Sequence, residues 1–216
     1  QRWANVLPKP RRIAWLGTPV REEIAAIAAP DARYAGRDGA LRLLIVGGSL
    51  GAQTMNDLVL AALASMAPQE RPRIVHQAGE KLYEGLRGAY EGAGVQAEVV
   101  PFIADMAARY AWCDVLVCRS GAITVAEISA AGIAAILFPL PWFVADEQAA
   151  NAAYLADRGA GIALKQLETT PASLAALLRG LTRERLAAMA KQARALGKRE
   201  ATRACADLCE ELARAA

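Results

Sequence analysis

The sequence predicts an α/β fold, a Rossmann-like parallel sheet with helices on both faces. From Leu41 onward, short apolar runs alternate along the chain with longer segments of helical pattern. The segments between consecutive runs are long enough for a helix, and connections of that kind join parallel strands. The runs are also almost continuously hydrophobic, which is typical of strands covered on both faces. Ligands of such folds bind at the carboxyl ends of the strands, so the loops that follow the strands are where a site is expected.

The elements follow in order along the chain. Residues 1–40 carry several prolines and glycines in a short, broken apolar pattern, so we interpret 1–38 as a linker and lead-in and 39–216 as the domain. Strands are expected at 41–46, 73–76, 97–101, 114–118, 134–138 and 161–164. Helices are expected at 53–66, 80–92, 105–111, 122–131, 147–158, 172–180 and 183–215, the last broken near Gly197.

Composition limits the possible classes of protein. The 216 residues are 55% hydrophobic and 22% charged, which is too apolar for disorder and sufficient for a core. The formal net charge is +3 and the aromatic residues are few and scattered, so nucleic acid is not expected as a partner. The longest apolar stretch, 130–145, is shorter than the roughly 20 residues of a membrane span and contains prolines.

Cysteine and histidine usage gives no metal signal. The four cysteines form no Cys-x-x-Cys pair, the sequence has a single histidine, and there is no Asp-x-Asp motif. We therefore expect reduced thiols, no metal and no cofactor. The start of the chain does not resemble a signal peptide and is not a methionine, which suggests a piece of a longer protein.

A glycine-rich loop, Gly-Gly-Ser-Leu-Gly-Ala at 47–52, joins the first strand to the next helix. Glycine permits positive φ and a close approach of backbone to ligand, and the free N–H groups at a helix N-terminus favour an anion. The loop is therefore either a phosphate site formed by Gly48, Ser49 and Gly51 or a simple turn between strand and helix.

A second loop of this kind, Arg-Ser-Gly-Ala at 119–122, follows the fourth expected strand. Ser120 is a candidate N-cap for the helix that begins there. Glu127 lies about a turn and a half into that helix, too far along to close a capping box. A carboxylate there can accept hydrogen bonds from both hydroxyls of a ribose, and a solvated helix face is the alternative.

Two common nucleotide-binding patterns are missing. A dinucleotide site needs an acidic residue at the end of the second strand, where this chain has Val75-His76-Gln77, and the glycine loop lacks the Lys-Ser/Thr of a P-loop. The candidate ribose-binding acid, Glu127, instead lies on the helix after the fourth expected strand. This position favours a mononucleotide bound differently from the dinucleotides of those two patterns. For His76 we expect a satisfied place in the core or at a pocket edge and not the role of a general base.

These residues form part of an ordered series of motifs. The series is Gly17-Thr-Pro-Val-Arg21, the loop at 47–52, Phe102-Ile-Ala-Asp-Met106, Cys118-Arg-Ser-Gly-Ala122 with Thr124 and Glu127, and Asp146-Glu-Gln148 with Asn151. In order and spacing, from Gly17 to the C-terminus, it resembles the MurG family of peptidoglycan glycosyltransferases. The resemblance implies one half of a GT-B fold. It also implies inverting transfer of N-acetylglucosamine from UDP-GlcNAc to lipid I, giving lipid II, by a peripheral enzyme at the cytoplasmic face of the bacterial inner membrane.

The resemblance also assigns roles to single residues. For the nucleotide, it implies that Arg21, Ser49 and the surrounding glycines hold the diphosphate, that Thr124 lies in the phosphate region, that Ile103 meets uracil through its main chain, and that Glu127 takes the ribose hydroxyls.

For the sugar, the resemblance implies that Met106 and Ala122 line the pocket and that Gln148 and Asn151 read the hydroxyls of N-acetylglucosamine. This chain has Glu147-Gln148 where some members have paired glutamines, so the sugar contacts rest on a weaker match than the nucleotide contacts.

The family has a second Rossmann-like half, which would carry the lipid I acceptor site, the membrane-facing patch and the base. We therefore expect no catalytic residue in this chain and no turnover by this piece alone. Three alternatives stay open: another UDP-sugar-dependent GT-B protein, a non-catalytic nucleotide-binding module, and a nicotinamide oxidoreductase, which the missing second-strand acid disfavours. The C-terminal segment from Thr182 would return to the other half in the family; here we expect an amphipathic helix on its own sheet.

Overall fold

The computed structural model describes residues 14–48, 52–140 and 147–214. Within them lies a parallel sheet of six strands in the order β3-β2-β1-β4-β5-β6. The strands are β1 (Arg42–Val46), β2 (Arg73–Gln77), β3 (Glu98–Val100), β4 (Val115–Cys118), β5 (Ala135–Leu137) and β6 (Ile162–Ala163). The expected Rossmann-like fold is confirmed, and each strand lies within two residues of its expected bounds.

Helices connect the strands as the alternation predicts. They are α3 (Gln53–Ala64), α4 (Tyr83–Gly92), α5 (Met106–Trp112), α6 (Ala122–Ala131), α7 (Glu147–Ala156), α8 (Pro171–Arg179), α9 (Arg183–Ala195) and α10 (Ala201–Arg214), with a 3-10 turn η2 (Pro68–Glu70). The break expected near Gly197 is the gap between α9 and α10. Two short helices, α1 (Glu22–Ala25) and α2 (Pro30–Tyr34), were not predicted.

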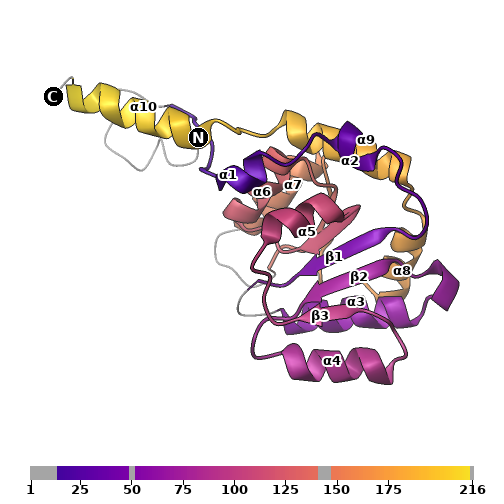
Figure 1. The fold of residues 1–216 in the computed structure, drawn as a ribbon. Helices are drawn as coiled ribbons and strands as arrows, with labels where there is room; N and C mark the ends of the chain where they lie inside the picture. The colour runs from indigo at the N-terminus through magenta and orange to yellow at the C-terminus, as the bar shows by residue number, and fades with distance from the viewer. Residues whose placement is uncertain (1–13, 49–51, 141–146, 215–216) are drawn as a thin grey trace.

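The helices form two layers, one on each face of the sheet (Figure 1). Alternate residues of β1 point to opposite sides, so Leu43 and Ile45 pack in a core with α3, α4 and α8, while Leu44 packs in a second core with α1, α5, α6 and α7. Helix α9 contributes to both cores, through Leu186 and Ala193. Both faces are covered, which explains the continuous hydrophobic runs.

The described part of the expected lead-in packs against the domain. Ile24 and Ile27 are buried in the second core. The guanidinium of Arg33 is also buried and donates to the carbonyls of Ala28, Ala131 and Gly132. Helices α1 and α2 have no detectable sequence periodicity, because they span only four and five residues. The boundary between residues 38 and 39 stays a prediction.

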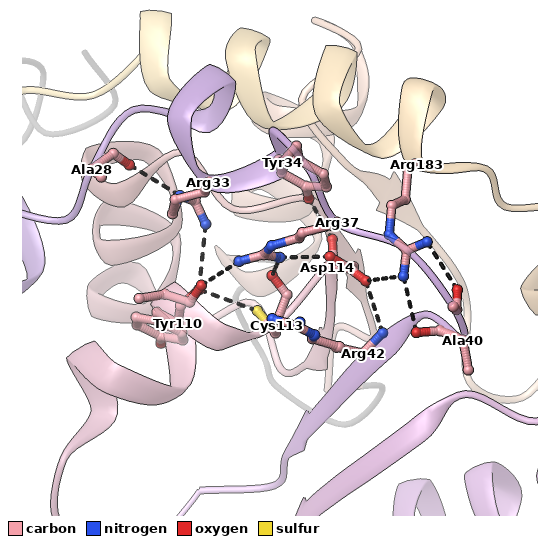
Figure 2. A network of polar contacts seen from close by, with 12 residues as sticks. Ala28, Arg33, Tyr34, Arg37, Ala40, Arg42, Tyr110, Cys113, Asp114 and Arg183 are labelled. Carbon is pink, nitrogen blue, oxygen red and sulfur yellow. Dashed lines mark hydrogen bonds and ion pairs between the residues drawn. The ribbon is translucent and has the colours of Figure 1, made fainter.

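A buried carboxylate, Asp114, ties the lead-in to the amino ends of β1 and β4 (Figure 2). Its Oδ1 lies 2.5 Å from Nη1 of Arg37, and its Oδ2 accepts from the backbone N–H of Arg42 at 2.9 Å and from Nη2 of Arg183 at 3.3 Å. Tyr34 donates to the Asp114 carbonyl. This network, Asp114 with Tyr34, Arg37, Arg42 and Arg183, joins α2, the loop before β1 and the start of α9 at one end of the sheet.

The C-terminal segment divides into two parts. Helix α9 packs against α2 and α6, as expected of an amphipathic helix on its own domain. Helix α10 extends away from the body of the molecule, and Ala201 is its single buried residue among those described (Figure 1). The expectation that the terminal helix lies on its own sheet is therefore wrong for α10. None of the helices in the described ranges has the length and apolar character needed to cross a membrane.

Candidate nucleotide-sugar site

The loops singled out in the sequence meet where the strand order reverses. Strands β1 and β4 are neighbours, and their last residues, Val46 and Cys118, pair in register. The loops after these strands therefore leave the sheet side by side. From β1 the chain continues to β2 on one side, and from β4 it continues to β5 on the other. Parallel α/β sheets bind ligands at such a switch point.

The loop after β1 requires glycine at two positions. A Cβ on Gly47 would lie 3.1 Å from the backbone nitrogen of Ala52, closer than most Cβ contacts, so a side chain here would require the start of α3 to shift. Gly48 has φ +84°, a left-handed conformation that other residues adopt at a cost. Gly48 is also exposed, as a backbone that meets a ligand must be. Ser49 and Gly51, the other expected phosphate residues in this loop, lie outside the described residues.

A buried hydrogen-bond chain joins β2 to α3 and α4. The ring of His76 contacts the Tyr90 hydroxyl through Nδ1 at 2.9 Å and Oδ1 of Asn56 through Nε2 at 3.1 Å. Asn56 donates its amide to the Ala78 carbonyl, so its oxygen accepts and the Nε2–H tautomer of His76 donates to it. Burial lowers the pKa of His76 to about 3. The expected satisfied role in the core is confirmed, because the ring has no exposed surface and both of its nitrogens are hydrogen-bonded to protein groups.

The two helices that follow β1 and β4 begin without side-chain caps. Helix α3 follows Ala52 and α6 follows Gly121, and neither N-cap residue accepts a side-chain hydrogen bond. By contrast, α5, α8 and α9 are capped by Asp105, Thr170 and Thr182. The first N–H groups of α3 and α6 have no acceptor within their own helix and are available to an anion.

The prediction of Ser120 as the α6 N-cap is wrong. Gly121 takes that place, and the buried Ser120 donates its Oγ to the carbonyl of Gln148 at 2.8 Å. The hydroxyl is directed away from the N–H groups of α6 and towards the start of α7, where it donates to this carbonyl. Ala122 and Thr124 stand in the first turn of α6, Ala122 exposed and Thr124 partly so. The helix end is thus left open towards the loop after β1.

Glu127 of α6 lies between Tyr110 of α5 and Arg21 of the lead-in. Its side chain is 11% exposed, its Oε2 accepts from the Tyr110 hydroxyl at 3.0 Å, and its Oε1 accepts from Nη2 of Arg21 at 3.3 Å. Arg21 is half exposed and also lies 3.7 Å from Glu23. The solvated helix face considered in the sequence analysis is excluded, because Glu127 is buried. The structure brings together Arg21 and Glu127, which are 106 residues apart.

From helix α7, the side chain of Asn151 contacts the loop after β4 and that of Gln148 contacts the loop after β5. The Asn151 amide donates to the Ser120 carbonyl at 3.0 Å, and Oε1 of Gln148 accepts from the backbone N–H of Leu140 at 3.1 Å. Asn151 thus uses its amide nitrogen, and Gln148 uses its amide oxygen. Each side chain keeps its second amide atom for other partners. The structure therefore brings both residues to the switch point.

A hollow of about 210 Å³ lies beside Asn151. Ala122 and Asn151 line it from α6 and α7, Gly17 from the lead-in, and Lys198 from the segment before α10. Two of the residues expected around the sugar, Ala122 and Asn151, thus share one cavity wall.

The loop after β3 approaches from the other side. Ile103 is buried and shares the second core with Met106 and with Val125 of α6, whereas Phe102 is 59% exposed. Asp105, in the middle of this motif, is an N-cap that accepts from the backbone N–H of Ala108 at 2.8 Å. Ile103 and Met106 are thereby held next to α6.

Two residues at this edge were not assigned roles from the sequence. Tyr110 contacts Glu127, and no local pattern reveals a bond between residues on separate helices. Arg119 donates Nη1 to the Phe138 carbonyl, its Nε is buried with no hydrogen-bond partner in the described part of the chain, and burial lowers its pKa. Its position directly after β4 was a usable signal. No cluster of three or more metal-ligating side chains occurs among the described residues.

The sequence matches the family model for the glycosyltransferase family 28 C-terminal domain over residues 42–208. The chain belongs to this family. Family 28 relatives include an enzyme of Aromatoleum aromaticum, 53% identical over 94% of this chain, and one of Dechloromonas aromatica, 51% identical over 93%. Both are named UDP-N-acetylglucosamine–N-acetylmuramyl-(pentapeptide) pyrophosphoryl-undecaprenol N-acetylglucosamine transferase.

The crystal structure of Acinetobacter baumannii MurG resembles this family 28 domain with a TM-score of 0.80 and 38% identity over 87% of the chain. The resemblance to the MurG family is thus confirmed. The chain spans 57% and 56% of the length of the two curated relatives and 55% of the solved chain. It corresponds to one part of those proteins, as the expected half of a glycosyltransferase fold requires.

Proposed function

We propose that this chain is the donor-binding half of an inverting glycosyltransferase that moves N-acetylglucosamine from UDP-GlcNAc to lipid I, giving lipid II. The observation that carries the proposal is the 53% identity over 94% of the chain to a relative named for that donor and that acceptor. The geometry at the carboxyl ends of β1 and β4 supports it independently, because a buried carboxylate, a half-exposed arginine and two uncapped helix N-termini meet there.

Glu127 binds the ribose in this proposal. A carboxylate is an acceptor with two oxygens, and a ribose offers two neighbouring hydroxyl donors. Each hydrogen bond to a charged group contributes about 1.5 to 3 kcal/mol. Ile103, in the loop after β3, contacts uracil through its main chain on the same side of α6.

The diphosphate lies between the glycine loop and the start of α6. The free N–H groups of α3 and α6 point towards it, with Gly48, Ser49, Gly51 and Thr124 around it. Helix N-termini stabilise an anion by about 0.3 to 1 kcal/mol each at exposed positions. Arg21 is half exposed, so its guanidinium can turn from Glu127 to a phosphate. This positive environment stabilises the charge that UDP acquires as it leaves.

The sugar occupies the space between α6 and α7. Met106 and Ala122 provide the apolar walls of the sugar pocket. Nε2 of Gln148 and Oδ1 of Asn151 form hydrogen bonds with the sugar hydroxyls. The acceptor site, the membrane-facing surface and the base that takes the acceptor proton belong to the part of the relatives that this chain does not span. The complete protein then acts as a peripheral enzyme at the cytoplasmic face of the inner membrane.

Calorimetric titration of the 216-residue chain with UDP, UDP-GlcNAc, UDP-galactose and NAD tests the proposal. We expect UDP and UDP-GlcNAc to bind, UDP-galactose to bind more weakly than UDP-GlcNAc, and NAD not to bind. Equal binding of the two sugar nucleotides would favour a GT-B protein with another donor. Transfer of N-acetylglucosamine to a lipid I analogue by this chain alone would contradict the assignment of the base.

A further inference from the structure

Glu127 contacts two different kinds of group. On one side Oε2 meets the hydroxyl of Tyr110, whose ring is buried between α5 and the sheet and is 2% exposed. On the other side Oε1 meets Arg21, whose side chain is 50% exposed and lies on the lead-in. One carboxylate oxygen is therefore held from the interior, and the other lies at the open side of the site.

The Tyr110 hydroxyl is suited to a permanent contact. Burial, reinforced by the charge of Glu127, raises the pKa of Tyr110 well above its ordinary value, so the phenol keeps its proton and donates it. The ring is packed in the second core, and the Tyr110 carbonyl accepts from the buried Arg33 at 3.3 Å. The donor thus has little freedom to move away from Oε2.

A glutamate side chain has three rotatable bonds and needs such a partner to keep one orientation. Without Tyr110, the carboxylate of Glu127 would be held by Arg21 alone, and the proposed function requires Arg21 to be free to turn to the diphosphate. A tyrosine that only filled the core would not need to direct its hydroxyl to a side chain that faces a ligand.

We propose that Tyr110 is a positioning residue that fixes the Glu127 carboxylate by donating to Oε2, so that the carboxylate meets the ribose hydroxyls in one preset orientation. This inference rests on the proposed function, in which Glu127 binds the ribose. Tyr110 itself does not touch the nucleotide. Its effect on binding is therefore confined to ligands that carry ribose hydroxyls.

The test uses Tyr110→Phe, which keeps the ring and removes the hydroxyl. Calorimetry compares UDP with 2′,3′-dideoxyuridine 5′-diphosphate on the 216-residue chain. We expect Tyr110→Phe to weaken UDP binding roughly tenfold and to leave the affinity for the dideoxy nucleotide unchanged. A hydrogen bond that only stabilised the fold would give the same change for both nucleotides.

Tyr90→Phe is the matched control, because Tyr90 is also a buried tyrosine with a hydrogen-bonded hydroxyl, in the other core. It should leave the ratio of the two affinities as in the wild type. In a Glu127→Ala background, Tyr110→Phe should cause no further loss of UDP binding.

The outcomes separate the two proposals. An equal loss for both nucleotides in Tyr110→Phe, or no loss while Glu127→Ala weakens UDP binding, overturns the positioning role and leaves the proposed function standing. If Glu127→Ala binds UDP as the wild type does, or if the wild-type chain does not bind UDP, the ribose role of Glu127 fails and the role of Tyr110 fails with it.

Discussion

Two buried carboxylates lie at opposite ends of the same sheet, and their surroundings differ in kind. Asp114, at the amino end of β4, has no exposed surface and is engaged by the guanidinium groups of Arg37 and Arg183 and by the backbone of Arg42. Glu127, at the carboxyl-end edge, is held by one buried neutral hydroxyl and one half-exposed arginine. Asp114 is thus closed to any further partner, while Glu127 keeps an open side.

The difference indicates how burial should be interpreted in this fold. A carboxylate engaged by two cations and a backbone donor holds elements together, and its removal leaves those cations buried without compensation. A carboxylate with a half-exposed cationic partner can exchange that partner for a ligand. Both residues are acidic and buried, so burial alone does not distinguish a structural group from a binding group.

The largest expected effect is a loss of stability on removal of the Asp114 carboxylate. Asp114→Ala should lower the free energy of unfolding by about 3 to 5 kcal/mol, because Arg37 and Arg183 lose their buried counter-charge. Urea denaturation measures this change. UDP affinity of the folded variant should stay as in the wild type, since Asp114 lies at the other end of the sheet.

The control for that prediction is Asp31→Ala. Asp31 pairs with Lys191 on the surface, where its side chain is 75% exposed. An exposed pair contributes at most about 1 kcal/mol, so the free energy of unfolding should hardly change. A similar loss in both variants would show that the Asp114 network is not the closed structural group described above.

His76 extends the comparison, because it is a buried titratable group of β2 whose two ring nitrogens are both hydrogen-bonded. Its pKa in the folded state, about 3, lies below the unfolded value of about 6.5. The unfolded chain therefore binds the proton more readily, and stability falls as the pH drops below the unfolded pKa. Between about pH 7 and pH 5 the linked loss is about 2 kcal/mol.

Urea denaturation at several pH values checks this, with His76→Gln as the variant that lacks the titrating ring. The variant should be less stable at pH 7 and should show a smaller loss on acidification. An unchanged pH dependence in His76→Gln would contradict the assignment of the acid sensitivity to this ring.

A smaller effect is expected from removal of Arg21, the half-exposed partner of Glu127. Arg21→Ala should leave the free energy of unfolding within about 0.5 kcal/mol of wild type, because a half-exposed pair contributes little. UDP affinity should fall roughly tenfold, and the difference should shrink at high salt, while uridine, which lacks phosphate, should bind equally well. Arg87→Ala, which removes an exposed arginine paired with Glu84, is the control. If Arg21→Ala destabilised the fold and left UDP binding unchanged, Glu127 would resemble Asp114.

Much of the fold follows from the sequence. The continuous apolar runs and helix-length connections predicted all six strands, the parallel pairing of the sheet, and the helices from α3 to the break before α10. Helices α1 and α2 were not predicted, because a helix of four or five residues is too short to show a hydrophobic periodicity. Their stability comes from long-range contacts such as those of Arg33 with Ala131 and Gly132.

The candidate site was predictable to a lesser degree. The glycine loop at 47–52, Glu127 and the order of the motifs indicated which loops carry the site. Loops that follow parallel strands meet at one edge of the sheet, so these loops were expected to lie together. Side-chain partners across that edge were not predictable. The hydroxyl of Ser120 bonds to Gln148 and not to its own helix, and Tyr110 reaches Glu127 from another helix. Such contacts depend on packing geometry, which a linear pattern does not contain.

The central claim is that Glu127, unlike Asp114, is a binding group that recognises ribose hydroxyls. Calorimetric titration of Glu127→Ala with UDP and 2′,3′-dideoxyuridine 5′-diphosphate tests it most directly. In the wild type we predict at least roughly tenfold tighter binding of UDP than of the dideoxy nucleotide, and in Glu127→Ala no difference between them. A preference for UDP that survives in Glu127→Ala would contradict the account.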